Sequence, residues 1–125
     1  MRFFPCHHLL VLGSPGSVRI ISAVAQVTSY WIDVDADIEK AVDVFRVHVV
    51  PDNKAYIEGP TIFNELLAGI AQYGYILKRP AYGVSTSQYD PYFGGVHALA
   101  FKNGKWAGAA DPRRDGTAKT AWKKD

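Results

Sequence analysis

Apolar residues at the start of the chain follow two different patterns. Residues 9–12 are four consecutive apolar residues closed by the Gly-Ser-Pro-Gly run at 13–16, which predicts a short buried strand followed by a turn. Ser17 is then a favourable N-cap for a helix in which apolar residues recur at spacings of four, three and four. This stripe consists of Ile20, Val24, Val27 and Trp31. It is widened by Ile21, Ala25, Thr28 and Ile32. We therefore expect this helix to be largely buried.

Further along the chain, short strands alternate with helices. The predicted elements are a short helix at 38–43, strands at 45–50 and 54–59, a helix from Pro60 to Gly74 and a strand at 76–77. Pro, Gly and Ser make 79–95 a loop, and the Asn-Gly pair at 103–104 predicts a tight hairpin between strands at 96–101 and 106–110. We expect one domain over residues 1–125 with an α+β fold, in which helices cover a mixed or antiparallel sheet.

Composition excludes several classes of function. The 125 residues are 48% apolar or aromatic and 21% charged, as in an ordinary globular domain, and the net charge of +2 gives no reason to expect a nucleic-acid partner. Seven of the 14 basic residues lie in 102–125, which we interpret as a solvated basic tail. The longest apolar run has four residues, against the roughly 20 of a membrane span. Pro5 and the pair His7-His8 interrupt any signal-peptide pattern at the N-terminus.

Metal-ligating residues do not occur at useful spacings. The chain has a single cysteine, and its four histidines show none of the usual metal-binding patterns. Asp33, Asp35 and Asp37 imitate the opening of a calcium loop, but Ile38 stands where that loop needs glycine and Val44 where it needs glutamate. These aspartates instead suit the start of the second predicted helix. We expect no metal ion and no cofactor.

The Gly-Ser-Pro-Gly turn is the one place where the pattern suggests chemistry. Backbone N–H groups at the start of a helix suit a phosphate, a carboxylate or a developing oxyanion. The turn matches neither the phosphate-binding loop of nucleotide-hydrolysing proteins nor the dinucleotide fingerprint, and no Gly-x-Ser-x-Gly elbow is present. The residues alone leave two interpretations open, an anion site or a plain connection from strand to helix.

Four sequence blocks between residue 9 and about residue 118 carry more specific information. They are Leu-Gly-Ser-Pro-Gly-Ser-Val-Arg-Ile-Ile at 12–21, Ala-Val with Arg46 and His48 at 41–48, Gly-Gly-Val-His-Ala-Leu at 94–99, and Gly-Ala-Ala-Asp-Pro-Arg-Arg-Asp-Gly at 108–116. In this order they resemble the C-terminal part of the small subunit of gamma-glutamyltranspeptidases. That family carries a Gly-Ser-Pro-Gly-Gly turn, Ala-Val-x-Ala-Pro-Arg-Ile-His, Gly-Gly-x-Gln-Ala-Ile and Ala-Asp-Pro-Arg-Arg-x-Gly.

The resemblance implies an N-terminal-nucleophile hydrolase fold, a four-layer αββα sandwich of which this chain would form part. Such enzymes cleave themselves, and the new N-terminal threonine attacks the gamma-glutamyl amide of glutathione and related donors. A terminal threonine serves as nucleophile and, through its own amine, as base. The acyl group then passes to water or to an acceptor amine. Many members are periplasmic or extracellular, whereas the residues of this chain leave its compartment open.

By the same resemblance, Gly16 and Ser17 are the oxyanion-hole residues, acting through their backbone N–H groups. Ser17 stands where the family has a second glycine. Its Cβ costs about 1–2 kcal/mol if the site requires a positive φ. Phe45 and His97 replace a family proline and glutamine, at positions for which we expect no chemical role.

The family nucleophile precedes the glycine turn, and only 12 residues do so here. None of the threonines lies in a matching context; they are Thr28, Thr61, Thr86, Thr117 and Thr120. We expect a gamma-glutamyltransferase-like fragment that is inactive alone and requires an upstream, nucleophile-bearing segment to act on a gamma-glutamyl substrate. The alternatives are a noncatalytic interaction module or a remnant of a truncated gene, and, less favoured, a small hydrolase with an unrecognised site.

Overall fold

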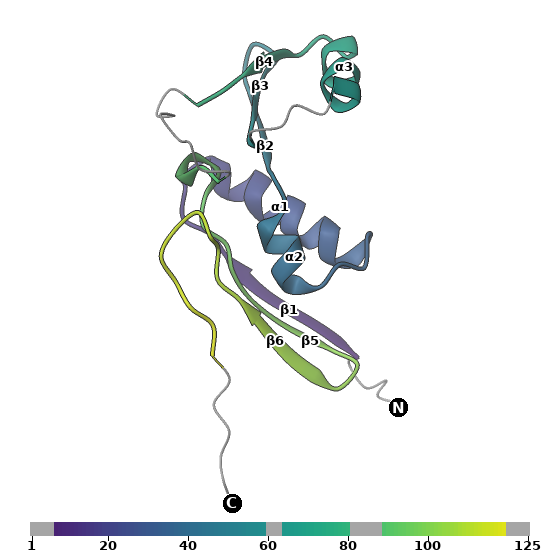
Figure 1. Ribbon diagram of the computed structural model, residues 1–125, viewed down its shortest axis with the longest axis vertical. Helices are drawn as coiled ribbons and strands as arrows, with labels where there is room; N and C mark the ends of the chain where they lie inside the picture. The colour runs from purple at the N-terminus through teal and green to yellow at the C-terminus, as the bar shows by residue number, and fades with distance from the viewer. Residues whose placement is uncertain (1–6, 60–63, 81–88, 120–125) are drawn as a thin grey trace, which may run out of the picture.

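The computed structural model describes residues 7–59, 64–80 and 89–119 and contains two three-stranded sheets with helices (Figure 1). The elements are β1 (His8–Gly13), α1 (Arg19–Ile32), α2 (Ile38–Asp43), β2 (Val47–Val50), β3 (Lys54–Ile57), α3 (Asn64–Gln72), β4 (Ile76–Lys78), the 3₁₀ turn η1 (Pro91–Phe93), β5 (His97–Lys102) and β6 (Lys105–Ala109). This is the expected α+β class. No helix within the described ranges is long and apolar enough to span a membrane.

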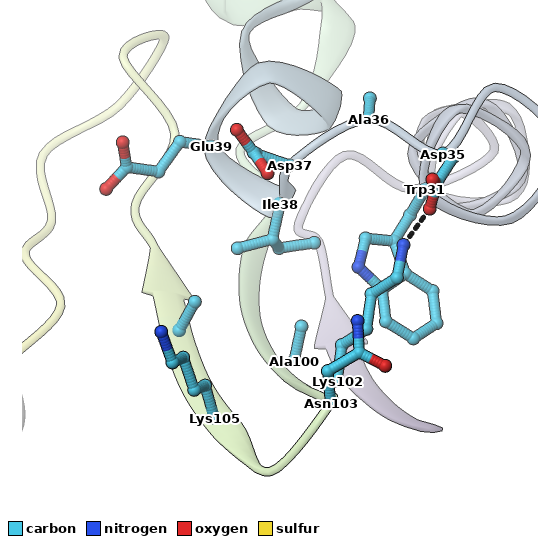
Figure 2. Close-up of a pocket in the computed structure, with 11 residues that line it drawn as sticks. Trp31, Asp35, Ala36, Asp37, Ile38, Glu39, Ala100, Lys102, Asn103 and Lys105 are labelled. Carbon is cyan, nitrogen blue, oxygen red and sulfur yellow. Dashed lines mark hydrogen bonds and ion pairs between the residues drawn. The ribbon is translucent and has the colours of Figure 1, made fainter. Parts of the chain in front are cut away.

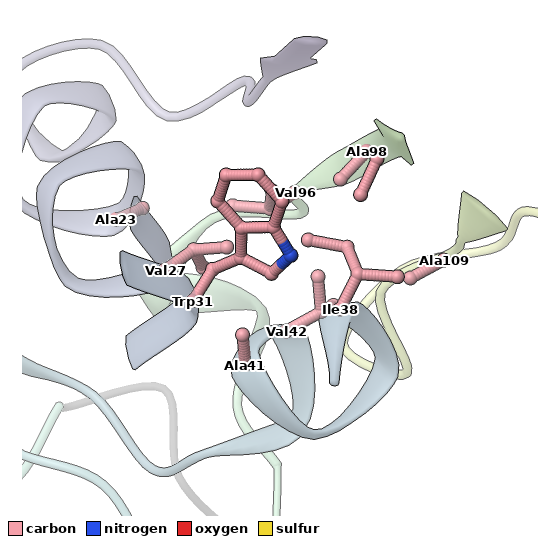
Figure 3. Close-up of a cluster of buried hydrophobic side chains, with 10 residues drawn as sticks. Ala23, Val27, Trp31, Ile38, Ala41, Val42, Val96, Ala98 and Ala109 are labelled. Carbon is pink, nitrogen blue, oxygen red and sulfur yellow. The ribbon is translucent and has the colours of Figure 1, made fainter. Parts of the chain in front are cut away.

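The first sheet has the strand order β1-β5-β6 and is antiparallel throughout. Helices α1 and α2 cover one of its faces (Figure 1). That face presents small residues, among them Ala98, Ala100 and Ala109, which allow the helices to pack closely against the strands. The helices fill the space with larger side chains, including Trp31 and Ile38 (Figure 3). This layer is the hydrophobic core of the described residues.

The second sheet has the order β2-β3-β4, with β2 antiparallel and β4 parallel to β3. Asp52 and Asn53 form the β2–β3 turn with φ values of 66° and 55°, the left-handed conformation that tight hairpin turns require. Gln26 of α1 joins this sheet to the first layer. Its amide donates to the Val47 carbonyl at 2.7 Å and accepts from the Val47 N–H at 2.9 Å, as a neighbouring strand would.

Most predicted elements are confirmed, with shifted ends. The strand predicted at 9–12 forms as β1, but the prediction that it is buried is wrong, because Leu9 and Val11 on its outer side are exposed. The hairpins β2–β3 and β5–β6 form as predicted. The strand predicted at 45–50 begins only at Val47, because Phe45 and Arg46 precede the ladder. The predicted helix start at Pro60 lies outside the described residues, as do residues 81–88 of the predicted loop; α3 is described from Asn64.

The prediction that α1 is largely buried is wrong. Ala23, Val27 and Trp31 are buried against the sheet, but Ile21 is 78% exposed and Ile32 is 61% exposed. The sheet covers only one side of the helix. Within the described residues, the additional apolar positions therefore point away from the core.

The other face of the first sheet is apolar and, in the described part of the chain, only partly covered, by residues 116–118 beside His97 and Gly108. Leu9, Val11, Leu99 and Trp106 alternate with core-facing residues along their strands and are between 44% and 56% exposed. We call these four residues the outer apolar face. It lies on the side of the sheet opposite α1 and α2.

Candidate functional site

The glycine turn connects β1 to α1 and contains two consecutive residues with positive φ. Gly16 has a φ of 133° and Ser17 a φ of 56°. Few residues other than glycine adopt such values, because Cβ approaches the backbone. The turn therefore places a serine in a conformation that only glycine adopts without strain. The φ of Ser17 is positive, which is the condition under which its Cβ was expected to cost conformational free energy.

The predicted role of Ser17 as N-cap is wrong. Helix α1 begins at Arg19, and no side-chain hydrogen bond caps its start. The N–H groups of Arg19 and Ile20 instead donate to the carbonyls of Gly16 and Ser17, at 3.0 and 3.1 Å. An N-cap residue has an extended backbone that aims its side chain at the helix, whereas the left-handed Ser17 does not.

Neither the Gly16 nor the Ser17 N–H donates a hydrogen bond to any residue that the structure describes. Ser17 is exposed and Gly16 is partly buried. Two consecutive amides without a protein acceptor, ahead of a 14-residue helix, can receive an anion from outside, and the positive end of the helix dipole favours it.

The turn packs against Gly94 and Gly95, which lie just before β5 and are separated from it by Val96. A Cβ on Gly94 would lie 2.6 Å from Ser14 Oγ, and a Cβ on Gly16 would lie 3.6 Å from the Gly94 Cα. The Ser14 hydroxyl accepts a hydrogen bond from the Gly95 N–H at 3.1 Å. Sequence spacing gave no sign of this contact, because 81 residues separate Ser14 from Gly95.

Four buried charged side chains form a cluster behind this site; they are Arg46, Glu58, Asp111 and Arg113. Asp111 binds Arg46 at 2.7 Å and Arg113 at 3.0 Å. Arg113 also binds both carboxylate oxygens of Glu58, through Nε at 2.8 Å and through Nη2 at 2.5 Å. Two positive and two negative groups balance, which is how buried charges are tolerated. We call this group the buried ion cluster.

The environment of the buried ion cluster favours the charged forms of Asp111 and Arg113. Burial would raise the pKa of Asp111, but the backbone N–H of Arg113 and the charges of Arg46 and Arg113 outweigh it and hold that pKa below its usual value. Burial would lower the pKa of Arg113, yet its hydrogen bonds and ion pair with Glu58 raise it. The pKa of Arg46 is lowered by burial and by the neighbouring Arg113.

The buried ion cluster also binds the backbone around Gly94 and Gly95. Arg46 donates to the Phe93 carbonyl at 2.9 Å, and Asp111 accepts from the Val96 N–H at 2.6 Å. Arg114 donates to the Gly94 carbonyl at 3.3 Å. The Gly94–Gly95 segment, against which the glycine turn packs, is thus held by hydrogen bonds to the residues before and after it.

The model of the family described as gamma-glutamyltranspeptidase matches residues 6–121. The chain belongs to this family. Its fold is similar to that of a highly active mutant of the gamma-glutamyltranspeptidase from Pseudomonas nitroreducens, with 27% identity, a TM-score of 0.74, and coverage of 98% of this chain and 60% of that one. It is also similar to a mutant of the Helicobacter pylori gamma-glutamyltranspeptidase, with 30% identity, a TM-score of 0.69, and coverage of 84% of this chain and 54% of that one.

The fold also resembles that of the Bacillus anthracis transpeptidase CapD, with 24% identity, a TM-score of 0.74, and coverage of 95% of this chain and 68% of that one. A search of curated proteins returned no match. The chain spans 60% of the Pseudomonas structure that it matches. The match to gamma-glutamyltranspeptidase structures confirms the predicted fold class.

The sequence blocks typical of gamma-glutamyltranspeptidases meet in space. The first block contacts the third through Ser14 and Gly95, and the third contacts the fourth through Val96 and Asp111. The second joins the fourth through Arg46 and Asp111. In the sequence these blocks indicated only the resemblance, and no pattern pointed to a role for the arginines or for Asp111.

Other side chains near the turn form a polar and aromatic layer. The Arg19 guanidinium lies 4.4 Å from the centre of the Tyr92 ring, and the His48 ring nitrogen Nδ1 is 2.8 Å from the Ser22 hydroxyl. Burial, followed by the charge of Arg19, lowers the pKa of His48, which is therefore neutral at neutral pH. The exposed His97 places its ring nitrogen Nδ1 at 3.2 Å from the Gly95 carbonyl oxygen, and its ring packs against Gly116.

The remaining residues considered for chemistry are the potential metal ligands, the aspartates before α2 and the threonines. No group of three or more potential metal ligands occurs in the described residues. Asp37 is the residue directly before α2, at the predicted helix start, and its side chain makes no capping hydrogen bond. Thr28 lies inside α1 and Thr117 follows β6. The remaining threonines, Thr61, Thr86 and Thr120, lie outside the described residues.

A pocket of about 750 Å³ lies between the start of α2 and the β5–β6 hairpin (Figure 2). Five of its eleven lining residues are charged. Among them, Lys102 pairs with Asp35 and lies 5.9 Å from the centre of the Trp31 ring. The pocket is lined by the hairpin end of β5 and β6, whereas the glycine turn packs beside the opposite end of β5. None of its lining residues belongs to the turn or to the buried ion cluster.

Proposed function

We propose that this chain supplies the oxyanion hole of a gamma-glutamyl-transferring or gamma-glutamyl-hydrolysing enzyme, and that the threonine nucleophile comes from a segment outside it. The observation that carries the proposal is the pair of amides at Gly16 and Ser17, which have no acceptor among the described residues and lie in a turn with two positive φ values. The N-terminal side of α1 provides the favourable dipole.

In this reaction the threonine hydroxyl attacks the gamma-glutamyl carbonyl carbon while its proton passes to the threonine amine. The carbonyl oxygen becomes an oxyanion, and the Gly16 and Ser17 N–H groups donate to it. The tetrahedral intermediate then collapses, the C–N bond breaks, and the leaving amine takes up the proton. Attack on the acyl-enzyme by water or by an acceptor amine releases the product. Loss of one oxyanion donor costs such enzymes about 10²–10³ in kcat.

The serine at position 17 is compatible with this role, since its backbone N–H is retained. Its left-handed conformation carries a cost of about 1–2 kcal/mol relative to glycine. We therefore expect Ser17→Gly to keep or increase the acylation rate. A tenfold or larger decrease would mean that the serine side chain itself takes part.

We further propose that the nucleophile-bearing segment packs on the outer apolar face. Large contiguous apolar patches mark interaction sites on proteins, and Leu99 and Trp106 on adjacent strands are each at least half exposed. Burying them against a second layer would bring that segment onto the sheet whose first strand leads into the glycine turn.

The test is reconstitution with a separately produced nucleophile-bearing segment of the Pseudomonas nitroreducens enzyme that lacks its matching C-terminal part. Cleavage of a chromogenic gamma-glutamyl anilide is expected only from the mixture. Gly16→Ala should abolish most of this activity, because φ at Gly16 is 133°. Gly13→Ala is the matched control, since φ there is not positive and no atom lies within 4 Å of the new Cβ. Equal effects of the two substitutions would contradict the assignment.

The second candidate function is a noncatalytic interaction module, and the outer apolar face is the observation that favours it. In the same mixture this function predicts binding without cleavage. Trp106→Lys would then weaken binding, whereas Gly16→Ala would leave it unchanged. Because Trp106→Lys should weaken binding under either candidate, the two are separated by cleavage: activity in the mixture that is lost in Gly16→Ala supports the catalytic candidate, and binding without any cleavage supports the interaction module.

A further inference from the structure

We infer that Ser14 is a positioning residue for the oxyanion-hole amides: its hydroxyl ties the glycine turn to the Gly94–Gly95 segment and thereby stabilises the left-handed pair Gly16–Ser17. This inference rests on the proposed function for its consequence in catalysis, but its structural part can be tested without activity. It concerns a side chain to which neither the sequence pattern nor the family resemblance assigns a role.

The first observation is that the Ser14 hydroxyl is used in both directions. It accepts from the Gly95 N–H at 3.1 Å and donates to the Pro15 carbonyl at 2.8 Å, one residue before Gly16. One oxygen thus connects the turn to a segment 81 residues away. Alanine at this position can make neither bond.

The second observation is that the partner segment is itself immobilised. The Val96 N–H is bound by the buried carboxylate of Asp111 at 2.6 Å, and the Phe93 carbonyl by the buried guanidinium of Arg46 at 2.9 Å. Gly95 therefore offers Ser14 a fixed N–H. Backbone conformations of high energy persist only where the surroundings determine them, and this contact provides that constraint for the turn.

The third observation is the close fit of the two segments. A Cβ on Gly94 would lie 2.6 Å from Ser14 Oγ and 3.2 Å from the Pro15 carbonyl oxygen. Gly94 has a φ of 92°, so conformation and space both require glycine at this position. The hydroxyl of Ser14 occupies the space that the missing Cβ leaves.

The experiment measures hydrogen exchange at single amides of the full chain, for wild type, Ser14→Ala, Ser14→Thr and Ser29→Ala. The Gly95 amide reports the bond itself. The amides of Arg19 and Ile20 report the turn, because they donate to the carbonyls of Gly16 and Ser17. Ser29 is the control, as its hydroxyl binds Asp33 near the far end of α1.

Ser14→Ala should accelerate exchange at Gly95, Arg19 and Ile20 by about tenfold. Ser29→Ala should leave all three amides unchanged, and Ser14→Thr should restore protection because it keeps the hydroxyl. Acceleration at Gly95 alone would overturn the inference, since the hydroxyl would then anchor only the Gly94–Gly95 segment. Unchanged exchange at Gly95 in Ser14→Ala would overturn it as well.

In the reconstituted enzyme, with rates expressed per titrated active site, Ser14→Ala should lower kcat by about ten- to a hundredfold with little change in KM, and Ser14→Thr should recover it. An equal loss in Ser14→Ala and Ser29→Ala, or no loss, would contradict positioning. Absence of activity in every variant, with the exchange pattern as expected, would refute the proposed function and leave the role of Ser14 in the turn intact.

Discussion

The two faces of the first sheet are built from the same three strands but differ in how well the described chain buries them. The inner face carries alanines under α1 and α2, and its core residues are at most 7% exposed. The outer apolar face carries larger side chains that are about half exposed. Burial of large apolar groups is the main source of stability in a fold, so stability should depend on the inner face and association on the outer one. The two faces can be tested separately.

The largest contrast is expected between the two tryptophans. Trp31 is 7% exposed in the inner layer and Trp106 is 56% exposed on the outer one. Trp31→Ala should lower the free energy of unfolding by about 3–5 kcal/mol, because it removes buried area and leaves a cavity. Trp106→Ala should lower it by less than about 1 kcal/mol. Urea unfolding of both variants measures the difference, and similar losses would remove the distinction between the faces.

A loss of about 3 kcal/mol is expected from Asp111→Asn. The substitution leaves two buried guanidinium groups facing the single carboxylate of Glu58. Asp35→Asn is the control, because the Asp35 side chain is 77% exposed in its pair with Lys102 and should contribute less than about 1 kcal/mol. Equal effects in urea unfolding would show that the buried ion cluster does not support the inner layer.

A smaller effect is expected from pH. The pKa of His48 is lowered from 6.5 in the folded chain, so the unfolded chain binds more protons as pH falls below about 6.5. Stability should then decrease by at most about 1.4 kcal/mol per pH unit from this group. His48→Gln should flatten the curve below about pH 6.5.

Below about pH 4 a second decrease should follow from Asp111, whose pKa is lowered in the folded chain. Its contribution is complete above the unfolded pKa and is lost as pH falls through the folded one. Unfolding curves at a series of pH values measure both windows. A wild-type curve that is flat from pH 7 to 5 would contradict the His48 assignment.

The smallest effect on stability, less than about 0.5 kcal/mol, is expected from Leu99→Lys on the outer apolar face. Its effect should instead appear in self-association. The wild-type chain should associate at tens of micromolar in sedimentation, and the variant should do so less. The apolar stripe of α1 should contribute less to this association, because its Val27 and Trp31 are buried. A monodisperse wild-type monomer would argue against an uncovered interface.

Local rules predicted the parts of the fold that depend on neighbouring residues. Asn103 and Gly104 have φ values of 52° and 76°, as the predicted β5–β6 turn requires. The spacing of Val27 and Trp31 identified α1. Periodicity could not tell which flank of α1 is buried, since Ile21 extends the apolar stripe and is exposed. That choice depends on what packs against the helix.

The candidate site was predicted in part. The turn at Gly16 and Ser17 was located from the glycine pattern and the resemblance, and its positive φ values match the condition stated for strain. The Ser14–Gly95 bond and the Arg46–Asp111 pair could not be predicted, because their partners are 81 and 65 positions apart and no local spacing connects them.

The side chain of Gln26 has a consequence for how this chain could polymerise. β2 lies at the edge of the second sheet, and unpaired edge strands recruit strands from other molecules. Gln26 occupies both outward-facing groups of Val47, so an incoming strand would first have to displace an amide from the chain's own helix. Fibre growth by strand addition should therefore be disfavoured at β2, and Gln26→Ala would open that edge.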